Sequence, residues 1–319
     1  MLFSPSSIWN APLPADAPID PESAQLVSGL LAEVRAEERA GVGPWLATST
    51  ASTPIYIVPA DEPTVDVSLD DPALPWRRSL ARALRSVPIP PGARPARGRD
   101  AQMTIWQPAT DRLWELFHAR LEADGWHAAW GGAMDDVSRS PGYYTAASWP
   151  GAQANWGATA TSFPVAAGVI TLAQIRAGAI DHALALDVPR PRAGVVAWPA
   201  QRGDGTGPPS AIPEGAHLRL DPTLDLDALP MPPLTRMIAV AAQRYGLIVR
   251  DGAPAISLFA EDPTQYGGGR LYWGRHAIFG GLTPQQILAA FPWSHLQVLR
   301  MTLVRVPRAS KFLDAALRG

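Results

Sequence analysis

The sequence predicts a mainly β protein, a single β-sandwich or jelly-roll domain over residues 1–319 with several peripheral helices. Three observations favour this fold. The 34 prolines are spread along the chain and divide it into short elements joined by turns. Segments in which apolar residues alternate with polar ones recur from residue 102 onward. A doubly wound sheet would require helices to alternate with strands, and residues 100–135 do not show this alternation. No linker divides the chain, so 1–100 is expected to be a mixed segment packed on a β-sandwich core formed by 101–319.

The first hundred residues are expected to contain two helices and two strands. Asp20 and Pro21 are typical of a helix start, and apolar residues at helical spacing carry this helix to Arg39. Strands are predicted at 55–58 and 64–69, followed by a helix over 76–86. The side chains expected to anchor this segment to the core are Trp9, Trp45 and Trp76.

The remainder of the chain is predicted to be mostly strands. They are expected around 103–105 and at 113–119, 126–130, 180–188, 195–198, 217–220, 247–250, 255–260 and 296–306. Two helices interrupt them. Thr171 caps a short one through Arg176, and Pro233–Tyr245 forms a longer amphipathic one that ends at Gly246.

Composition excludes several classes of function. The net charge is −2 and the basic residues are scattered, which argues against a nucleic-acid partner. The chain has no cysteine, so disulfides and thiolate metal sites are excluded. No stretch approaches the roughly 18 apolar residues that cross a bilayer, so no membrane span is expected. No two histidines lie at ligand spacing on one helix and no cofactor motif is present, so neither a metal nor a cofactor is predicted. Calcium bound by scattered oxygen ligands stays open, although no calcium-loop signature is present.

Aromatic and acidic residues are densest in Gly125–Trp156, a predicted strand followed by a long loop. Long loops inside compact domains are often functional, and tryptophan rings suit stacking on sugar faces. Asp136 is the first candidate for acid–base chemistry in this segment. The expected sugar platform consists of Trp126, Trp130, Tyr143 and Trp149. The alternative is a Trp-rich core strand in which an aspartate merely caps a turn.

A second candidate segment is Ile180–Leu186. If it is a strand, His182 shares a face with apolar residues while Asp181 lies on the opposite face, so the two side chains point apart. This placement disfavours a Ser-His-Asp relay through the adjacent pair. Asp181 is then the better candidate for contacting a ligand, and His182 is expected to be a histidine of the core.

A third candidate segment runs from Trp198 into a Gly- and Pro-rich loop. Glu214 follows this loop, and a carboxylate there could partner another in catalysis. Arg202 and Arg219 could bind the carboxylate of a uronate through two parallel hydrogen bonds, although each one alone is typical of a solvated surface arginine.

Several phrases run through most of the length and resemble a family of bacterial, largely actinobacterial, proteins of unassigned activity. They are Phe3-Ser-Pro-Ser-Ser-Ile-Trp-Asn, Trp126-His-Ala-Ala-Trp-Gly-Gly, Trp156-Gly-Ala-Thr-Ala-Thr, Ile180-Asp-His-Ala-Leu and Ile212-Pro-Glu-Gly-Ala. The family is similar to secreted jelly-roll carbohydrate-active proteins. The resemblance implies an extracellular protein whose signal peptide is not part of this sequence.

The leading hypothesis is therefore a glycoside hydrolase acting on a polysaccharide or oligosaccharide without a cofactor. Asp136 would supply one carboxyl group and Asp181 or Glu214 the other. A polysaccharide lyase is the first alternative, with His127 or His182 and a tyrosine moving protons. The second alternative is a non-catalytic glycan-binding or cell-surface module, which needs the aromatic platform but no carboxylate pair.

Overall fold

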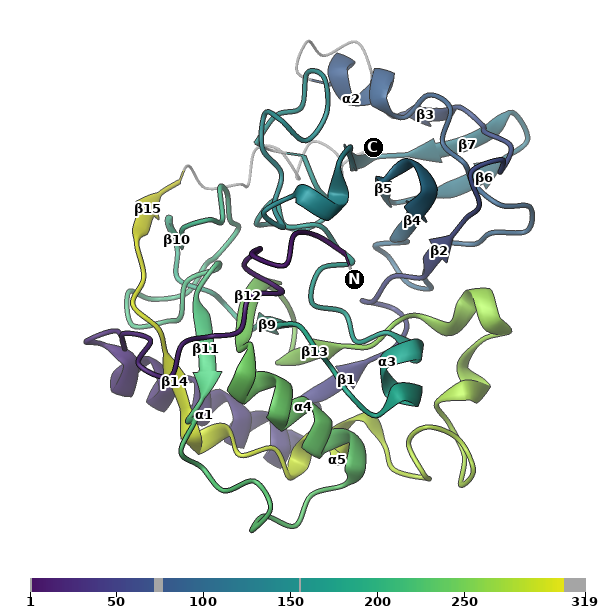
Figure 1. Cartoon of the computed structure of the whole chain (residues 1–319). Coiled ribbons are helices and arrows are strands. Elements are labelled where there is room, and N and C mark those ends of the chain that lie inside the picture. The colour runs from purple at the N-terminus through teal and green to yellow at the C-terminus, as the bar shows by residue number, and fades with distance from the viewer. Residues whose placement is uncertain (1, 72–76, 155, 307–319) are drawn as a thin grey trace. The chain divides into compact units, whose positions relative to one another are not determined.

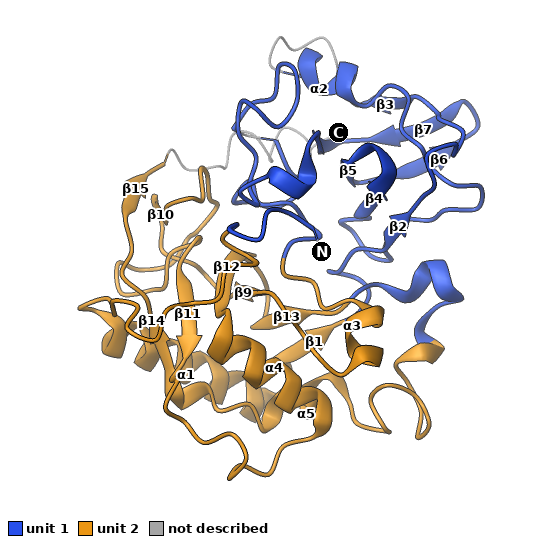
Figure 2. Cartoon of the chain, in the orientation of Figure 1, with its two compact units in different colours: residues 1–7, 48–167, 261–269 blue, residues 8–47, 168–260, 270–319 orange. Residues whose placement is uncertain are grey.

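The computed structural model describes residues 2–71, 77–154 and 156–306. Within these residues the chain forms 15 strands and five α-helices, so the prediction of a mainly β protein is confirmed (Figure 1). Two compact units share the chain, and each is made of three separate segments (Figure 2). Unit 1 comprises residues 1–7, 48–167 and 261–269, and unit 2 comprises residues 8–47, 168–260 and 270–319.

Unit 2 is built on a mixed six-stranded sheet with the strand order β1-β13-β9-β12-β11-β14. These strands are β1 (Trp45–Ala47), β9 (Leu184–Val188), β11 (His217–Leu220), β12 (Leu247–Gly252), β13 (Ser257–Phe259) and β14 (Leu296–Val298). The pairs β1–β13 and β9–β12 are parallel, and every residue of β9 is buried. Burial on both faces is typical of parallel strands and explains why β9 is apolar except at Asp187.

Unit 2 has four helices among its described residues, and the first, third and fourth of them along the chain pack against strands of this sheet (Figure 1). The four helices are α1 (Ser23–Ala40), α3 (Leu172–Ala177), α4 (Pro233–Arg244) and α5 (Pro284–Ala289). α1 begins two residues later than predicted, because the Asp20 carboxylate accepts the Glu22 amide hydrogen at 2.9 Å instead of capping the helix. Gly41 ends α1 in the left-handed region, with φ of 67°. The predicted cap at Thr171 is confirmed as a reciprocal capping box with Gln174.

Unit 1 contains two smaller sheets, with the orders β2-β4-β5-β8 and β3-β7-β6. The strands are β2 (Ile55–Ile57), β3 (Val67–Leu69), β4 (Met103–Gln107), β5 (Arg112–Phe117), β6 (Arg120–Glu122), β7 (Gly125–Ala128) and β8 (Trp130–Met134). The helix expected over 76–86 is α2 (Arg78–Ala83), while Trp76 lies outside the described residues. Trp9 and Trp45 both belong to unit 2, where Trp9 is 1% exposed.

The finer expectation of one sandwich or jelly roll is not confirmed, because the described strands are distributed over four sheets that include parallel pairs. The fourth sheet is a two-stranded ribbon of β10 (Val195–Ala197) and β15 (Leu303–Arg305). The one-domain expectation for 1–319 stays a prediction. None of the described helices has the length and apolar character that a membrane crossing needs.

Short 3-10 helices complete the described secondary structure. They are η1 (Pro108–Thr110), η2 (Val137–Arg139), η3 (Pro263–Tyr266), η4 (Gly269–Leu271) and η5 (Trp293–His295).

Candidate functional site

Three carboxyl groups gather in unit 2 around the buried side chain of Glu214. One oxygen each of Asp204, Glu214 and Asp251 lies within 4.8 Å of the others. Asp204 is exposed, Asp251 is half-buried and Glu214 is fully buried. We call these three residues the carboxyl cluster. The cluster places acids of different accessibility next to one another.

Sheet geometry positions Asp251 at the carboxyl end of the parallel pair β9–β12. The register shifts between Val249 and Asp251, so that Asp251, and not Arg250, lies opposite Asp187. Such a bulge re-aims the side chains that follow it and is frequent next to active sites. Arg250 is buried and forms an ion pair with Asp187 at 3.5 Å. Ligands of open α/β sheets bind at the carboxyl ends of parallel strands, which is where Asp251 lies.

Glu214 is 0% exposed because the glycine-rich loop after β10 lies directly on its carboxyl group. Its two oxygens accept the amide hydrogens of Asp204 at 3.4 Å and Gly205 at 3.2 Å. A Cβ atom at Gly203 would collide with a Glu214 oxygen, so the loop needs glycine at this position. Glu214 therefore holds the segment that carries Asp204.

Burial raises the pKa of Glu214 well above its ordinary value, and the neighbouring charges of Asp204 and Asp251 raise it further. A side-chain hydrogen bond between Glu214 and Asp204 also favours the protonated form of Glu214. The pair can thus hold one proton in a hydrogen bond between two carboxyl groups. A proton stored beside an exposed carboxyl group is the arrangement that general acid–base chemistry needs.

An exposed aromatic residue and an arginine lie near the cluster along the chain. The Ala197 amide donates to the Glu214 carbonyl at 2.7 Å, and the next residue, Trp198, is 53% exposed. Arg202 is half-buried on the loop that carries Asp204. The structure therefore brings the predicted residues Trp198, Arg202 and Glu214 into one part of unit 2.

The predicted residues Asp181 and His182 do not belong to the cluster. The strand expected over 180–188 begins only at Leu184, so the alternation argument for these two side chains does not hold. Instead, Gln174 bridges them, donating to Asp181 at 2.8 Å and contacting His182 Nε2 at 3.1 Å. His182 is half-buried, and desolvation lowers its pKa.

Arg219 is 5% exposed and has structural partners within unit 2. Its Nε donates to Gln297 at 2.9 Å, and its Nη1 donates to the carbonyls of Pro14 and Ala15 at 3.0 Å each. The expected role of Arg219 in binding a uronate stays a prediction, but these contacts already bind its guanidinium group.

The aromatic segment of unit 1 is more buried than its composition indicated. Trp126 is 8% exposed, whereas Trp130 and Tyr143 are half-buried. Trp149 is half-buried too, with its ring edge against Trp114. The remaining two rings of the loop, Tyr144 and Trp156, are 0% exposed and belong to the core.

Asp136 lies in unit 1, is exposed, and adopts the left-handed region with φ of 49° at the start of η2. Its neighbour Asp135 forms an ion pair with Arg112 at 2.6 Å. Among the described residues Asp136 is not part of either group of close acidic or histidine side chains. Its catalytic role stays a prediction.

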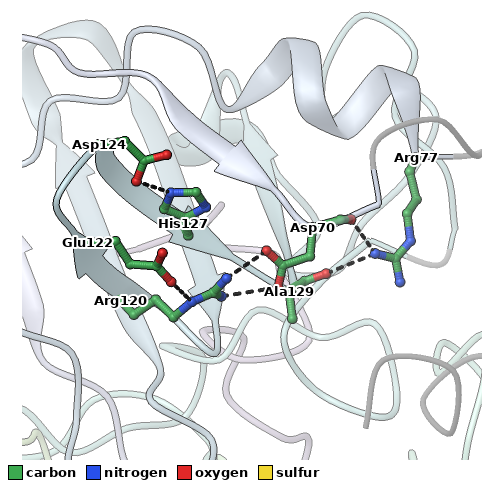
Figure 3. A network of polar contacts seen from close by, with 7 residues as sticks. All are labelled: Asp70, Arg77, Arg120, Glu122, Asp124, His127 and Ala129. Atoms are coloured by element: carbon green, nitrogen blue, oxygen red, sulfur yellow. Dashed lines mark hydrogen bonds and ion pairs between the residues drawn. The ribbon is translucent and has the colours of Figure 1, made fainter. Parts of the chain in front are cut away.

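The second such group lies in unit 1 and consists of Glu122, Asp124 and His127 (Figure 3). His127, predicted as a proton carrier, forms a hydrogen bond to Asp124 at 2.9 Å. The donor sets of the two groups differ. The carboxyl cluster offers oxygen alone, which suits a hard cation such as Ca²⁺, whereas an imidazole nitrogen also suits transition metals.

Asp204 and Asp251 were not predicted as site residues. The cluster depends on pairing between strands that are distant in sequence and on a bulge, and no local pattern shows either. One signal was available, because Asp204 lies in a glycine-rich loop and Asp251 precedes a glycine at the end of β12, and glycine lets the backbone approach a carboxyl group closely.

Comparison with protein-family models, with curated proteins and with solved structures found no match.

Proposed function

We propose that the protein is a glycoside hydrolase whose catalytic centre is the carboxyl cluster of unit 2. The observation that carries this proposal is the contact between two accessible carboxyl groups, Asp204 and Asp251, and the buried acid Glu214, whose raised pKa retains a proton. Polysaccharide as the substrate and an extracellular location belong to the same proposal.

Each side chain has a distinct role in the proposed reaction. Asp204 is exposed and hydrogen-bonded to Glu214, so it delivers the shared proton to the oxygen of the leaving sugar. Asp251, whose Oδ1 accepts the Gly252 amide hydrogen at 2.9 Å, attacks the anomeric carbon. Once the leaving sugar has departed, the ionised Asp204 takes a proton from the water molecule that hydrolyses the ester on Asp251, which restores both carboxyl groups. Glu214 touches no substrate and acts as a positioning residue whose hydrogen bond to Asp204 holds the proton in place.

Carboxyl separation decides the stereochemical course. Enzymes that invert configuration need about 6.5–9.5 Å between the two groups to fit a water molecule, and retaining enzymes need about 5–5.5 Å. The oxygens of the cluster lie within 4.8 Å of one another. An upper limit of 4.8 Å is too short for the water molecule of an inverting reaction, so we propose a covalent intermediate on Asp251 and retention of configuration.

Trp198 supplies the proposed sugar platform. A large apolar ring that is 53% exposed is costly unless a partner covers it, and an indole face stacks well on a pyranose. Arg202, on the same loop as Asp204, adds a positive charge that would favour an acidic sugar.

The test is incubation of the full chain with a panel of bacterial and plant polysaccharides, scored for new reducing ends. Asp204→Asn and Asp251→Asn should each lose about 100-fold or more in rate. Glu214→Gln should instead move the pH profile of kcat, as expected for a positioning residue. Two matched controls, Asp136→Asn in unit 1 and Asp181→Asn in unit 2, should retain the wild-type rate.

Other outcomes would overturn the proposal. If a control loses activity while the cluster variants keep it, the catalytic centre lies at the sequence-predicted aspartate. Products that absorb in the ultraviolet as unsaturated uronates would identify a lyase. Binding of a polysaccharide without any cleavage would identify a glycan-binding module.

A further inference from the structure

The hairpin of β6 and β7 in unit 1 carries a second polar site that the proposed hydrolase does not use. Its residues Glu122, Asp124 and His127 each offer one ligand atom, and these atoms lie within 4.8 Å of one another (Figure 3). We propose that these three residues bind a divalent first-row transition metal ion, with Zn²⁺ as the representative ion.

Strand register brings the three side chains together. Glu122 pairs with Gly125 and Arg120 pairs with His127, so Glu122 and His127 lie on one face of the hairpin, and Asp124 lies in the two-residue turn. Gly125 faces Glu122 without a side chain, and a Cβ atom there would meet nothing within 4 Å. The hairpin therefore leaves open space beside Glu122 into which an ion fits.

Arg120 fixes Glu122 without consuming both of its oxygens. The Arg120 Nε donates to Glu122 Oε1 at 2.5 Å, while its two Nη atoms donate to the Asp70 carboxylate at 3.1 and 2.9 Å. Ligating carboxylates in metal sites are oriented by hydrogen bonds of this kind. Asp70 balances the charge of Arg120, so the guanidinium group repels a cation at Glu122 less than an unpaired arginine would.

His127 and Asp124 form the other half of the site. The His127 Nε2 lies 2.9 Å from Asp124 Oδ1, so the two side chains are already held next to each other. The two side chains are 17% and 75% exposed respectively, so an ion from solvent can reach them. Binding through Nε2 displaces the proton of that nitrogen to Nδ1 or to solvent, whereas binding through Nδ1 leaves the bond to Asp124 in place.

The donor set selects the class of metal. One imidazole nitrogen with two carboxylates suits Zn²⁺, Co²⁺ or Mn²⁺, whereas Mg²⁺ and Ca²⁺ prefer oxygen ligands alone. Three protein ligands leave at least one position of a tetrahedral ion to water or to an anionic ligand. The site is therefore built to hold an ion that still binds something else.

The test is calorimetric titration of the full chain, produced without a histidine tag and treated with chelator, with ZnCl₂ at pH 7.5. One ion per chain is expected. His127→Ala and Glu122→Gln should each weaken binding at least about tenfold. The matched control is His276→Ala, an exposed histidine in unit 2, which should bind like the wild type. Co²⁺ should give a visible absorption band that is lost in His127→Ala.

The outcomes separate a specific site from adventitious binding. Because Glu122 is 47% exposed at its side chain, Glu122→Gln tests the proposal even if His127→Ala fails to fold. The proposal is overturned if the wild type binds no Zn²⁺, if Glu122→Gln and His127→Ala bind it as the wild type does, or if Ca²⁺ at equal concentration displaces it.

Discussion

Replacing Glu214 by glutamine should change how the stability of the protein depends on pH. Burial, together with the charges of Asp204 and Asp251, raises the pKa of Glu214 above its ordinary value of 4.5. The folded protein then keeps a proton that the unfolded chain releases. The free energy of unfolding therefore falls as pH rises from about 4.5 toward the pKa of the folded state. Glutamine has no such proton, so the variant escapes this loss.

The magnitude follows from proton linkage. While Glu214 is protonated in the folded state and ionised in the unfolded state, each pH unit costs the wild type up to about 1.4 kcal/mol. Between pH 5 and 7 the variant should therefore gain up to about 2.7 kcal/mol relative to the wild type. The glutamine side chain can accept the Gly205 amide hydrogen and donate to Asp204, as the protonated acid does.

Urea unfolding followed by tryptophan fluorescence, repeated at pH 5, 6, 7 and 8, measures this difference. Glu38→Gln, at an exposed position of α1, controls for the loss of one glutamate. The reasoning is refuted if the difference between Glu214→Gln and wild type is the same at every pH, or if the variant loses relative stability as pH rises.

Three further predictions concern single side chains. Gly203→Ala should cost about 1–3 kcal/mol of unfolding free energy, because its Cβ would overlap the Glu214 carboxyl group, and an unchanged urea midpoint would contradict the close packing there. Glu115→Gln should cost about 1–3 kcal/mol, because the buried carboxylate accepts two loop amides at 2.6 Å each and an amide group can accept only one of them well. Thermal unfolding measures this loss of stability, and a Tm of Glu115→Gln equal to that of the wild type would contradict the prediction. Trp198→Ala should weaken oligosaccharide binding, measured by fluorescence titration, while its Tm stays within a few degrees of the wild-type value. If the variant binds with the same affinity as the wild type, Trp198 is not part of the sugar platform.

Sequence periodicity predicted the elements whose stability is local. α4 followed from apolar spacing, although its C-cap is Tyr245 and not the predicted Gly246, and the cap of α3 followed from Thr171. The Asp20 start of α1 was misplaced because its carboxylate satisfies an amide just before the helix. The residue types alone do not show whether an aspartate forms a turn before the helix or caps the helix itself.

The candidate site was predicted in part. Glu214, Trp198 and Arg202 were identified from the sequence because acid, aromatic and basic residues occur there in a loop-rich stretch. Asp204 and Asp251 were not identified, because their carboxyl groups come close only through the parallel pairing of β9 with β12 and a register shift. The burial of Trp126, which was predicted to be part of the sugar platform, was also missed.

The interleaved path of the chain has a consequence for synthesis on the ribosome. β1 pairs in parallel with β13, and Trp45 lies opposite Ser257, so an edge of the unit 2 sheet joins residues made early to residues made late. All of 48–167, the main segment of unit 1, emerges before that partner strand exists. The nascent chain must therefore carry the apolar face of α1 and the unpaired β1 for most of translation. Truncation before β13 removes the partner of β1, so shortened chains should depend on chaperones more than the intact protein does.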